Sequence, residues 1–466
     1  MNEDFEERNE ELDIIRKFED MLGNEIPVFF DLSDFELIID YYTASFEYTK
    51  AISACDMGIA QYPFSTELLI DKSQILAMSG DFAQALEIIT RVEEMDPDNT
   101  DVLLTRGVIF TQKGEFKDAI EYFKRAAEST TEDRDDIYFN IGLSYQTWGK
   151  LKAAIKYYQK CISLNPENEP ALLEMIYCLD ILGELEDSLP FFQRFVDDDP
   201  YSHTAWYNLG QVYSRLAIFD KAIGSFEYAT IIKSDFYTAF AHLANNYVAN
   251  GEYAKAIDAF ASSQEPDLPL ADTWCNIGEC YEKLHQWDLS RRYYQKAIDL
   301  DPEMDEAWFG IGVILDAQQK WFEAIHFYRK AATLYPESGE YWMSLGAAEY
   351  QVGNLNSSVE AYEKASQLLP GNKDVWQNWS AILFEQGEIE GAIDLMLDAI
   401  EAIPDEAELH YRICAYLLAG GKYKEAYNYL ENALILNFEK HKLLFEFFPE
   451  LESQRALARL IDQYRK

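Results

Sequence analysis

The chain has 466 residues, 48% of them hydrophobic and 15% aromatic, and its 83 acidic and 39 basic residues give a formal net charge of −44. A negative field of this strength repels nucleic acid and anionic membrane surfaces, so we expect neither as a partner. No run approaches the roughly 18 uninterrupted apolar residues of a membrane span, which excludes insertion into a bilayer.

Residues 1–31 are expected to form an acidic helix followed by an extended segment. An apolar stripe at helical spacing precedes Gly23 and consists of Ile14, Ile15, Phe18, Met21 and Leu22. Pro27 then disfavours helix in the residue before it. We interpret this segment as an N-terminal cap; the alternative is a segment that folds back into a groove of the same chain. Asp31–Asp34 is expected to cap the helix that follows.

A 34-residue unit fills the middle of the chain and is clearest at residues 305–338. Its first half places side chains at i, i+3, i+4 and i+7, on one face of a helix: Trp308, Ile311, Gly312 and Leu315. Its second half places a small, an aromatic and a small residue on one face of another helix: Ala324, Tyr328 and Ala331. Pro336 ends the unit, because proline cannot continue a helix. Neither helix buries its apolar face alone, so the unit needs copies of itself as neighbours.

Twelve copies are found in register, and one junction, near Thr130–Arg134, carries an extra residue. The copies begin at residues 32, 66, 100, 135, 169, 203, 237, 271, 305, 339, 373 and 407. The small residue at the eighth position is expected to let the two helices approach closely. Residues 261–270 shorten one second helix without changing the count, and we expect a hinge or an exposed contact loop at Ser262–Leu270.

This pattern resembles the tetratricopeptide repeat, here as a long array of the bacterial type, over residues 32–440. The resemblance implies an all-α fold, a right-handed superhelix (α-solenoid) of about twelve helix-turn-helix repeats. Arrays of this kind need a closing helix with a polar outer face, so we interpret residues 441–466 as a C-terminal cap. In this segment, exposure of a cluster at Phe445, Phe447 and Phe448 would favour a docking surface, and burial would exclude one.

The sequence contains no pattern typical of catalysis or of a cofactor site. A Gly-rich phosphate loop, a His-Glu-x-x-His segment and a Gly-x-Ser-x-Gly turn are all missing, and the six histidines are scattered over separate units. Four of the six cysteines fall at or beside small or apolar repeat positions, which predicts free buried thiols; Cys275 and Cys280 point to different sides of one helix. We therefore expect a non-catalytic protein with no cofactor and no metal. An acidic start in place of a secretory signal, together with reduced thiols, favours the cytoplasm.

The resemblance also implies which side chains face a concave groove: positions two, five, six, nine and twelve of each unit. Asparagine recurs at position six, at Asn140, Asn208, Asn276 and Asn378. Its amide offers both a donor and an acceptor to an extended peptide backbone, and some family members hold peptides in this way; the alternative is a hydrogen bond within the unit. Aromatic side chains expected to anchor a partner are Phe139, Tyr177, Tyr207, Phe309 and Tyr411.

Relatives that grip the acidic tails of Hsp70 and Hsp90 use a lysine at position five and an asparagine at position nine. Here position five is never lysine, and only Asn245 occupies position nine. Cations on the groove side are few, chiefly Arg215 and Arg412, whereas carboxylates are frequent: Asp40, Asp180, Glu279, Glu282 and Asp316. The sequence argues against a co-chaperone of this kind.

The features together favour a scaffold or adaptor that binds a neutral to basic segment of a partner protein in its groove. Two alternatives stay open. One is a holding chaperone or assembly factor for basic clients, which acts through the acidic outer face and loses its clients in salt. The other is a regulatory subunit of a larger complex. The acidic surface has a further interpretation, since charge alone keeps a long aromatic-rich array in solution.

Overall fold

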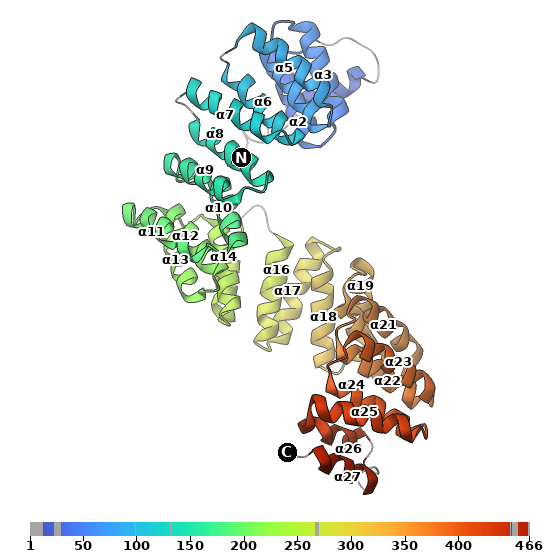
Figure 1. Ribbon diagram of the computed structural model, residues 1–466. Coiled ribbons are helices and arrows are strands. Elements are labelled where there is room, and N and C mark those ends of the chain that lie inside the picture. Colours follow the sequence, from blue (N-terminus) through green and yellow to red (C-terminus); the bar gives the residue numbers. More distant parts are fainter. Residues whose placement is uncertain are drawn as a thin grey trace. The chain divides into compact units, whose positions relative to one another are not determined.

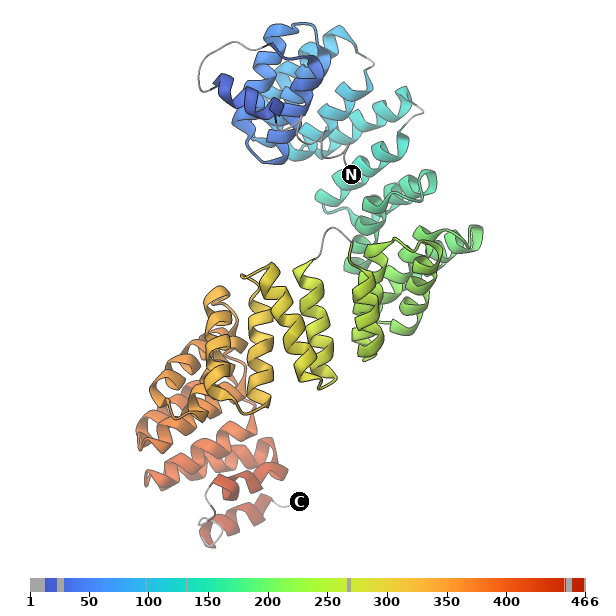
Figure 2. The same cartoon turned by 180° about the vertical axis from the view of Figure 1, so that it is seen from behind.

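The computed structural model describes residues 13–22, 29–97, 99–130, 133–265, 270–447, 449 and 455–464. Within these ranges short turns join a succession of helices (Figure 1), and the same succession is seen from behind in Figure 2. The expected all-α repeat fold is confirmed, with twelve helix pairs in the described part of the chain. Every first helix begins at the predicted residue except one, which begins at Arg134, one residue early. By internal contacts the chain divides into two compact units, Met1–Lys233 and Ser234–Lys466.

The first unit contains six helix pairs in its described residues. The first helices are α2 (Leu32–Ala44), α4 (Thr66–Met78), α6 (Thr100–Lys113), α8 (Arg134–Thr147), α10 (Glu169–Leu182) and α12 (His203–Arg215). The second helices are α3 (Tyr48–Gln61), α5 (Phe82–Met95), α7 (Phe116–Ser129), α9 (Leu151–Leu164), α11 (Leu189–Asp198) and α13 (Phe219–Ile232). A short 3₁₀ helix, η1 (Glu186–Ser188), precedes α11.

The second unit likewise has six helix pairs in the residues that are placed. Its first helices are α14 (Tyr237–Ala249), α16 (Ala271–Lys283), α18 (Asp305–Ala317), α20 (Gly339–Gln351), α22 (Lys373–Glu385) and α24 (Ala407–Ala419). Its second helices are α15 (Tyr253–Ser262), α17 (Trp287–Leu300), α19 (Trp321–Leu334), α21 (Leu355–Leu368), α23 (Ile389–Ala402) and α25 (Tyr423–Leu436). After them come η2 (Phe438–Lys442), α26 (Leu443–Phe447) and α27 (Arg455–Tyr464).

The repeats with glycine at position eight have closely packed helix pairs, as the sequence predicts. A Cβ atom built on Gly312 would lie 2.6 Å from the ring of Tyr328, and one on Gly142 would lie 2.5 Å from the ring of Tyr158. Real Cβ atoms do not come so close, so only glycine permits this contact. The aromatic ring of the second helix therefore lies directly on the backbone of the first.

Four tryptophans at position four join consecutive repeats through a hydrogen bond that the sequence does not reveal. The indole N–H of each donates to the carbonyl of the proline that closes the preceding repeat, six residues earlier. The pairs are Trp206 with Pro200 at 2.9 Å, Trp308 with Pro302 at 3.0 Å, Trp342 with Pro336 at 2.8 Å and Trp376 with Pro370 at 2.9 Å. The tryptophan thus fixes the turn between two repeats as well as filling space.

Two second helices are ten residues long, whereas the other ten in the described chain have fourteen. The shortening of α15 was predicted. The hinge or contact loop expected at Ser262–Leu270 is described except for residues 266–269. The shortening of α11 was not. Pro190 lies in the first turn of α11, and because proline tolerates only that part of a helix, the preceding residues form η1 instead.

Both ends of the array are covered in the described residues. A helix over residues 13–22 buries Ile15, Phe18 and Met21 in one cluster with residues of α2 and α3. The predicted cap at Asp31 is confirmed, since Asp31 and Asp34 form a capping box at the start of α2. At the other end Leu444, Leu457 and Ile461 join the core of α23 to α25. The division into 1–31, 32–440 and 441–466 remains a prediction.

Candidate functional site

A cavity of about 530 Å³ lies over three consecutive first helices of the second unit, α16, α18 and α20. We call it the α16–α20 pocket. Five carboxylates and one cation line it: Glu279, Glu282, Glu306, Asp316, Glu340 and Lys283. The remaining lining is aromatic, small or apolar: Cys275, Tyr294, Phe309, Gly310, Val313, Tyr328 and Ser344. The pocket is thus an acidic hollow with an aromatic floor.

The 34-residue period brings these side chains together. Glu306 and Glu340 both occupy position two, Cys275 and Phe309 position five, and Glu282 and Asp316 position twelve. Residues at one position of consecutive repeats share a face of the array, because each repeat stacks on the last in the same way. The pocket is therefore lined largely by the positions that the resemblance assigns to a groove.

Two tyrosines of the second helices orient Glu282 and Asp316, which we call the inner carboxylates. The Tyr294 hydroxyl donates to Glu282 Oε2 at 2.9 Å, and the Tyr328 hydroxyl donates to Asp316 Oδ2 at 3.4 Å. Gly310 stands at position six, where other repeats carry asparagine, and a Cβ atom there would lie 2.3 Å from the Tyr294 ring. The missing side chain admits Tyr294 beneath the pocket and so places its hydroxyl beside Glu282.

The inner and outer carboxylates have different environments. Burial raises the pKa of Glu282, against the opposing effect of the Tyr294 hydrogen bond, and burial likewise raises the pKa of Asp316 against the hydrogen bond from Tyr328. Glu279, Glu306 and Glu340 are exposed at the rim. Lys283 lies 3.9 Å from both Glu279 and Glu282. One cation faces five carboxylates, so a second cation entering the pocket is electrostatically favoured.

A smaller cavity of about 260 Å³ continues along α20, α22 and α24. It is lined by Ala347, Tyr350, Gln351, Tyr362, Asn378, Ala381, Ile382 and Arg412. The Tyr350 hydroxyl donates to the carboxylate of Glu385, and Arg412 Nη1 donates to the carbonyl of Gln377 at 2.9 Å. Helix α20 contributes lining residues to both cavities.

The four asparagines at position six do not form one ladder. Asn140 donates to the carbonyl of Asp136 at 2.9 Å, which is the alternative of a bond within the unit. Asn208 lines a separate cavity near α11, and Asn378 lines the smaller cavity beside Tyr362. Asn276 is half-buried on α16 and forms no hydrogen bond with the described residues.

The predicted aromatic anchors differ in exposure. Phe309 lines the α16–α20 pocket, its ring 4.6 Å from that of Tyr341 and 5.4 Å from that of Tyr328. Tyr177 is exposed, and Phe139 is half-buried against Tyr158.

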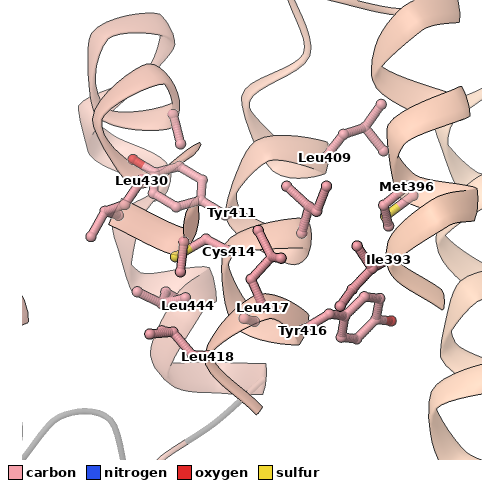
Figure 3. Packing of buried hydrophobic residues seen from close by; sticks show 14 of the residues in the cluster. Ile393, Met396, Leu409, Tyr411, Cys414, Tyr416, Leu417, Leu418, Leu430 and Leu444 are labelled. Atoms are coloured by element: carbon pink, nitrogen blue, oxygen red, sulfur yellow. The ribbon is translucent and has the colours of Figure 1, made fainter. Parts of the chain in front are cut away.

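Two anchors are not accessible, and for them the prediction is corrected. Tyr207 is 3% exposed and Tyr411 has no exposed surface. Figure 3 shows Tyr411 inside the hydrophobic cluster with Cys414 and Leu430. Its hydroxyl donates to the carbonyl of Asn437 at 2.9 Å. The segment after α25 covers this position, so the side chain stabilises the end of the array.

Glu306 and Glu340, the two rim carboxylates at position two, were not predicted from the sequence. Position two is one of the positions expected to face the groove, but acidic residues are so frequent in this chain that these two did not stand out. The sequence prediction for the terminal phenylalanines depends on their exposure. Phe445 is partly buried against the terminal core, and the side chains of Phe447 and Phe448 lie outside the described residues.

The described residues show the state of the thiols, the grouping of metal-binding side chains and the character of the helices. All six cysteines are free, and five of them are buried. Burial raises the pKa of Cys275, the half-buried thiol, to about 12. Across the described ranges, no three His, Cys, Asp or Glu side chains are grouped to hold a metal ion. Nor does any helix there have the length and apolar character needed to cross a bilayer.

Comparison with known proteins identifies the repeats. Tetratricopeptide repeat models match residues 76–138, 136–168, 271–304 and 305–338. The chain is therefore a tetratricopeptide repeat protein, as the sequence pattern predicts. Repeats of this kind form scaffolds for protein interaction, and this is the class to which the protein belongs.

Similar proteins share the repeats over part of their length. Protein bimA of Emericella nidulans is 27% identical over 165 residues, which cover 35% of this chain and 20% of bimA. Protein O-mannosyl-transferase TMTC1 of Homo sapiens is 21% identical over 185 residues, covering 39% of this chain and 21% of TMTC1. The chain thus spans about a fifth of these relatives. The crystal structure of the APC/C hetero-tetramer Cut9-Hcn1 aligns with 91% of this chain and 94% of its own, at 14% identity and a TM-score of 0.39.

Proposed function

We propose that this protein is a non-catalytic scaffold that holds a cationic segment of a partner protein in the α16–α20 pocket. The observation that carries the proposal is the lining itself, five carboxylates with one lysine around the half-buried ring of Phe309. A lysine or arginine side chain fits this arrangement, because its charged end meets the rim carboxylates while its methylene stem lies on Phe309.

The remaining groove supports an extended partner rather than a single side chain. Asn276 and Asn378 stand on first helices of the same compact unit and offer amide groups to a peptide backbone. The Asn378 amide opens toward the smaller cavity, next to Tyr350. We assign to these asparagines the role of fixing register, and to the pocket the role of selecting charge.

The six free thiols support a reducing compartment for this function, and we propose the cytoplasm. A partner of neutral to basic charge also suits the net charge of −44, which accelerates encounter with it.

Affinity capture from native extract, eluted in steps of salt, tests this function. Wild-type protein is compared with Glu279→Gln/Glu306→Gln/Glu340→Gln and with Asp288→Asn/Glu323→Gln/Glu360→Gln. The second set removes the same charge from exposed positions of α17, α19 and α21. A groove scaffold retains one or a few partners above about 0.5 M salt, and loses them only with the first set.

The alternative of a holding chaperone for basic clients gives the opposite pattern. Many basic proteins then elute together at low salt, and the two sets of substitutions weaken capture equally. That result would overturn the groove proposal, because it places binding on the overall charge of the chain rather than on the pocket.

A further inference from the structure

Two adjoining cavities lie over the second helices α9 and α11 of the first unit, with volumes of about 510 and 620 Å³. Ser163, Leu164 and Arg194 line both of them. We call the pair the α9–α11 recess. Its outer cavity lies mainly on second helices and its inner cavity reaches α12, so it is separate from the α16–α20 pocket.

An exception to the repeat pattern accompanies the recess. Position 27 of the repeat, which lies in the second helix, is small in nearly every repeat, for example Cys161 in α9 and Ala229 in α13, and both are fully buried. The corresponding residue of α11 is Phe195, whose ring is 5.1 Å from that of Phe191. Phe195 lines the inner cavity, so this cavity lies where a ring replaces the usual small residue.

The inner cavity has an apolar wall, and its polar lining includes Asn208 and the carboxylates of Glu167, Asp198 and Asp199. Ile162, Leu172 and Phe192 are buried and line it. Asn208, on α12, is only 7% exposed, lines the same cavity and forms no hydrogen bond with any described residue. The Asn208 amide is therefore available to a ligand group that donates and accepts hydrogen bonds beside this apolar wall.

The outer cavity is basic, although the chain as a whole is strongly acidic. Lys156, Lys160 and Arg194 line it together with Tyr138 and Phe191, and none of the described lining residues is acidic. Helix α9 carries three lysines and no carboxylate, in a chain with a net charge of −44.

The two lysines of this cavity are free of carboxylate partners. Lys156 and Lys160 make no ion pair with the described residues, and Lys160 lies over the rings of Tyr138 and Tyr157 at 5.3 and 4.6 Å. Arg194 Nε lies 3.7 Å from Asp198 Oδ2. Asp198, Asp199 and Glu167 line the inner cavity. The recess is therefore basic at the α9 end only.

We propose that the α9–α11 recess is a second docking site, which takes a segment of a partner protein with one apolar anchor and acidic residues on one side of it. The anchor enters the inner cavity between Leu172 and Phe192, and the adjacent peptide group pairs with Asn208. The acidic residues lie over Lys156 and Lys160. Charge complementarity selects this partner, because the rest of the chain repels acidic segments.

The test is binding of the full chain to an array of short acidic peptides, each with one apolar residue, beside an array in which lysine replaces every acidic residue. The best acidic peptide is then titrated by fluorescence polarisation. We expect Lys156→Gln/Lys160→Gln to weaken its affinity about tenfold. The control Lys296→Gln/Lys330→Gln changes the net charge equally on α17 and α19, where these lysines lie over Trp274 and Trp308, and leaves the affinity unchanged.

Asn208→Ala distinguishes the inner cavity from simple charge attraction. It is expected to weaken binding while leaving the salt dependence as it is, and the melting temperature reports separately on folding. The proposal is overturned if no acidic peptide binds better than its lysine counterpart, if both pairs of lysine variants behave alike, or if the chain instead self-associates through this face. Glu279→Gln/Glu306→Gln/Glu340→Gln is expected to have no effect, so failure here is distinct from failure of the α16–α20 pocket.

Discussion

At the scale of single residues, the difference between two glycines of one repeat shows how tightly the helices are fitted. A Cβ atom on Gly210, in α12, would lie 2.8 Å from Cε1 of Phe226, whereas one on Gly224, in α13, would meet no atom within 4 Å. The first glycine makes the contact possible, and the second only weakens its helix.

Alanine substitutions at these two glycines therefore have opposite effects. Gly210→Ala is expected to lower stability by about 1–3 kcal/mol, because the ring of Phe226 must move. Gly224→Ala is expected to raise it by about 0.5–1 kcal/mol, because alanine is the better helix former and nothing is displaced. Denaturation midpoints of the two variants check this, and equal shifts would show that position eight is not a point of close approach.

The inner carboxylates of the α16–α20 pocket predict a dependence on pH. Since burial raises the pKa of Glu282 in the folded chain above its unfolded value, its contribution to stability is present at low pH and is lost as the pH rises through the folded pKa. Glu282→Gln is therefore expected to raise the melting temperature at neutral pH, with a smaller gain in acid. Glu279→Gln removes an equal charge from an exposed site and serves as the control. A gain from Glu282→Gln that did not vary with pH would contradict this account.

At the scale of the element, the turn inside each repeat recurs in one conformation. Position fifteen has positive φ in every repeat, and glycine supplies it in eight of them, whereas Phe46, Ala217, His285 and Gln319 supply it in the other four. Residues other than glycine are strained there, at a cost of about 1–2 kcal/mol.

Gln319→Gly is accordingly expected to stabilise the protein by about 0.5–1 kcal/mol, since relief of strain exceeds the added flexibility of the unfolded chain. Gln318→Gly, one residue earlier and with φ of −86°, is expected to destabilise it. Chemical denaturation distinguishes the two, and a loss of stability at both positions would show that the turn carries no strain.

Most elements were predictable, because their signals are local and repeated. Gly312, Tyr328 and Pro336 place a tight pair and its end in a single sequence window, and the helices begin where these signals put them. The start of α11 was not foreseen, although Pro190 carried the signal. The difference between half-buried Phe309 and fully buried Tyr411 was not predictable, since both occupy position five and differ in what the next segment places over them.

Across the whole molecule, stability depends on contacts between neighbouring repeats. Within each compact unit a helix pair touches the pairs before and after it, so damage is expected to stay local. Hydrogen exchange of Gly210→Ala is therefore expected to lose protection in α10 to α13 while α2 to α7 keep theirs. Uniform loss across the first unit would show that it unfolds as one cooperative body.

Titration of the protein with a short fluorescent peptide that alternates lysine and leucine shows whether the α16–α20 pocket selects a cationic segment. Wild type and Asp288→Asn/Glu323→Gln/Glu360→Gln are expected to bind it alike. Glu279→Gln/Glu306→Gln/Glu340→Gln is expected to bind it about tenfold more weakly. Equal affinity in all three proteins, or equal binding of the peptide with glutamate in place of lysine, would contradict selection by this pocket.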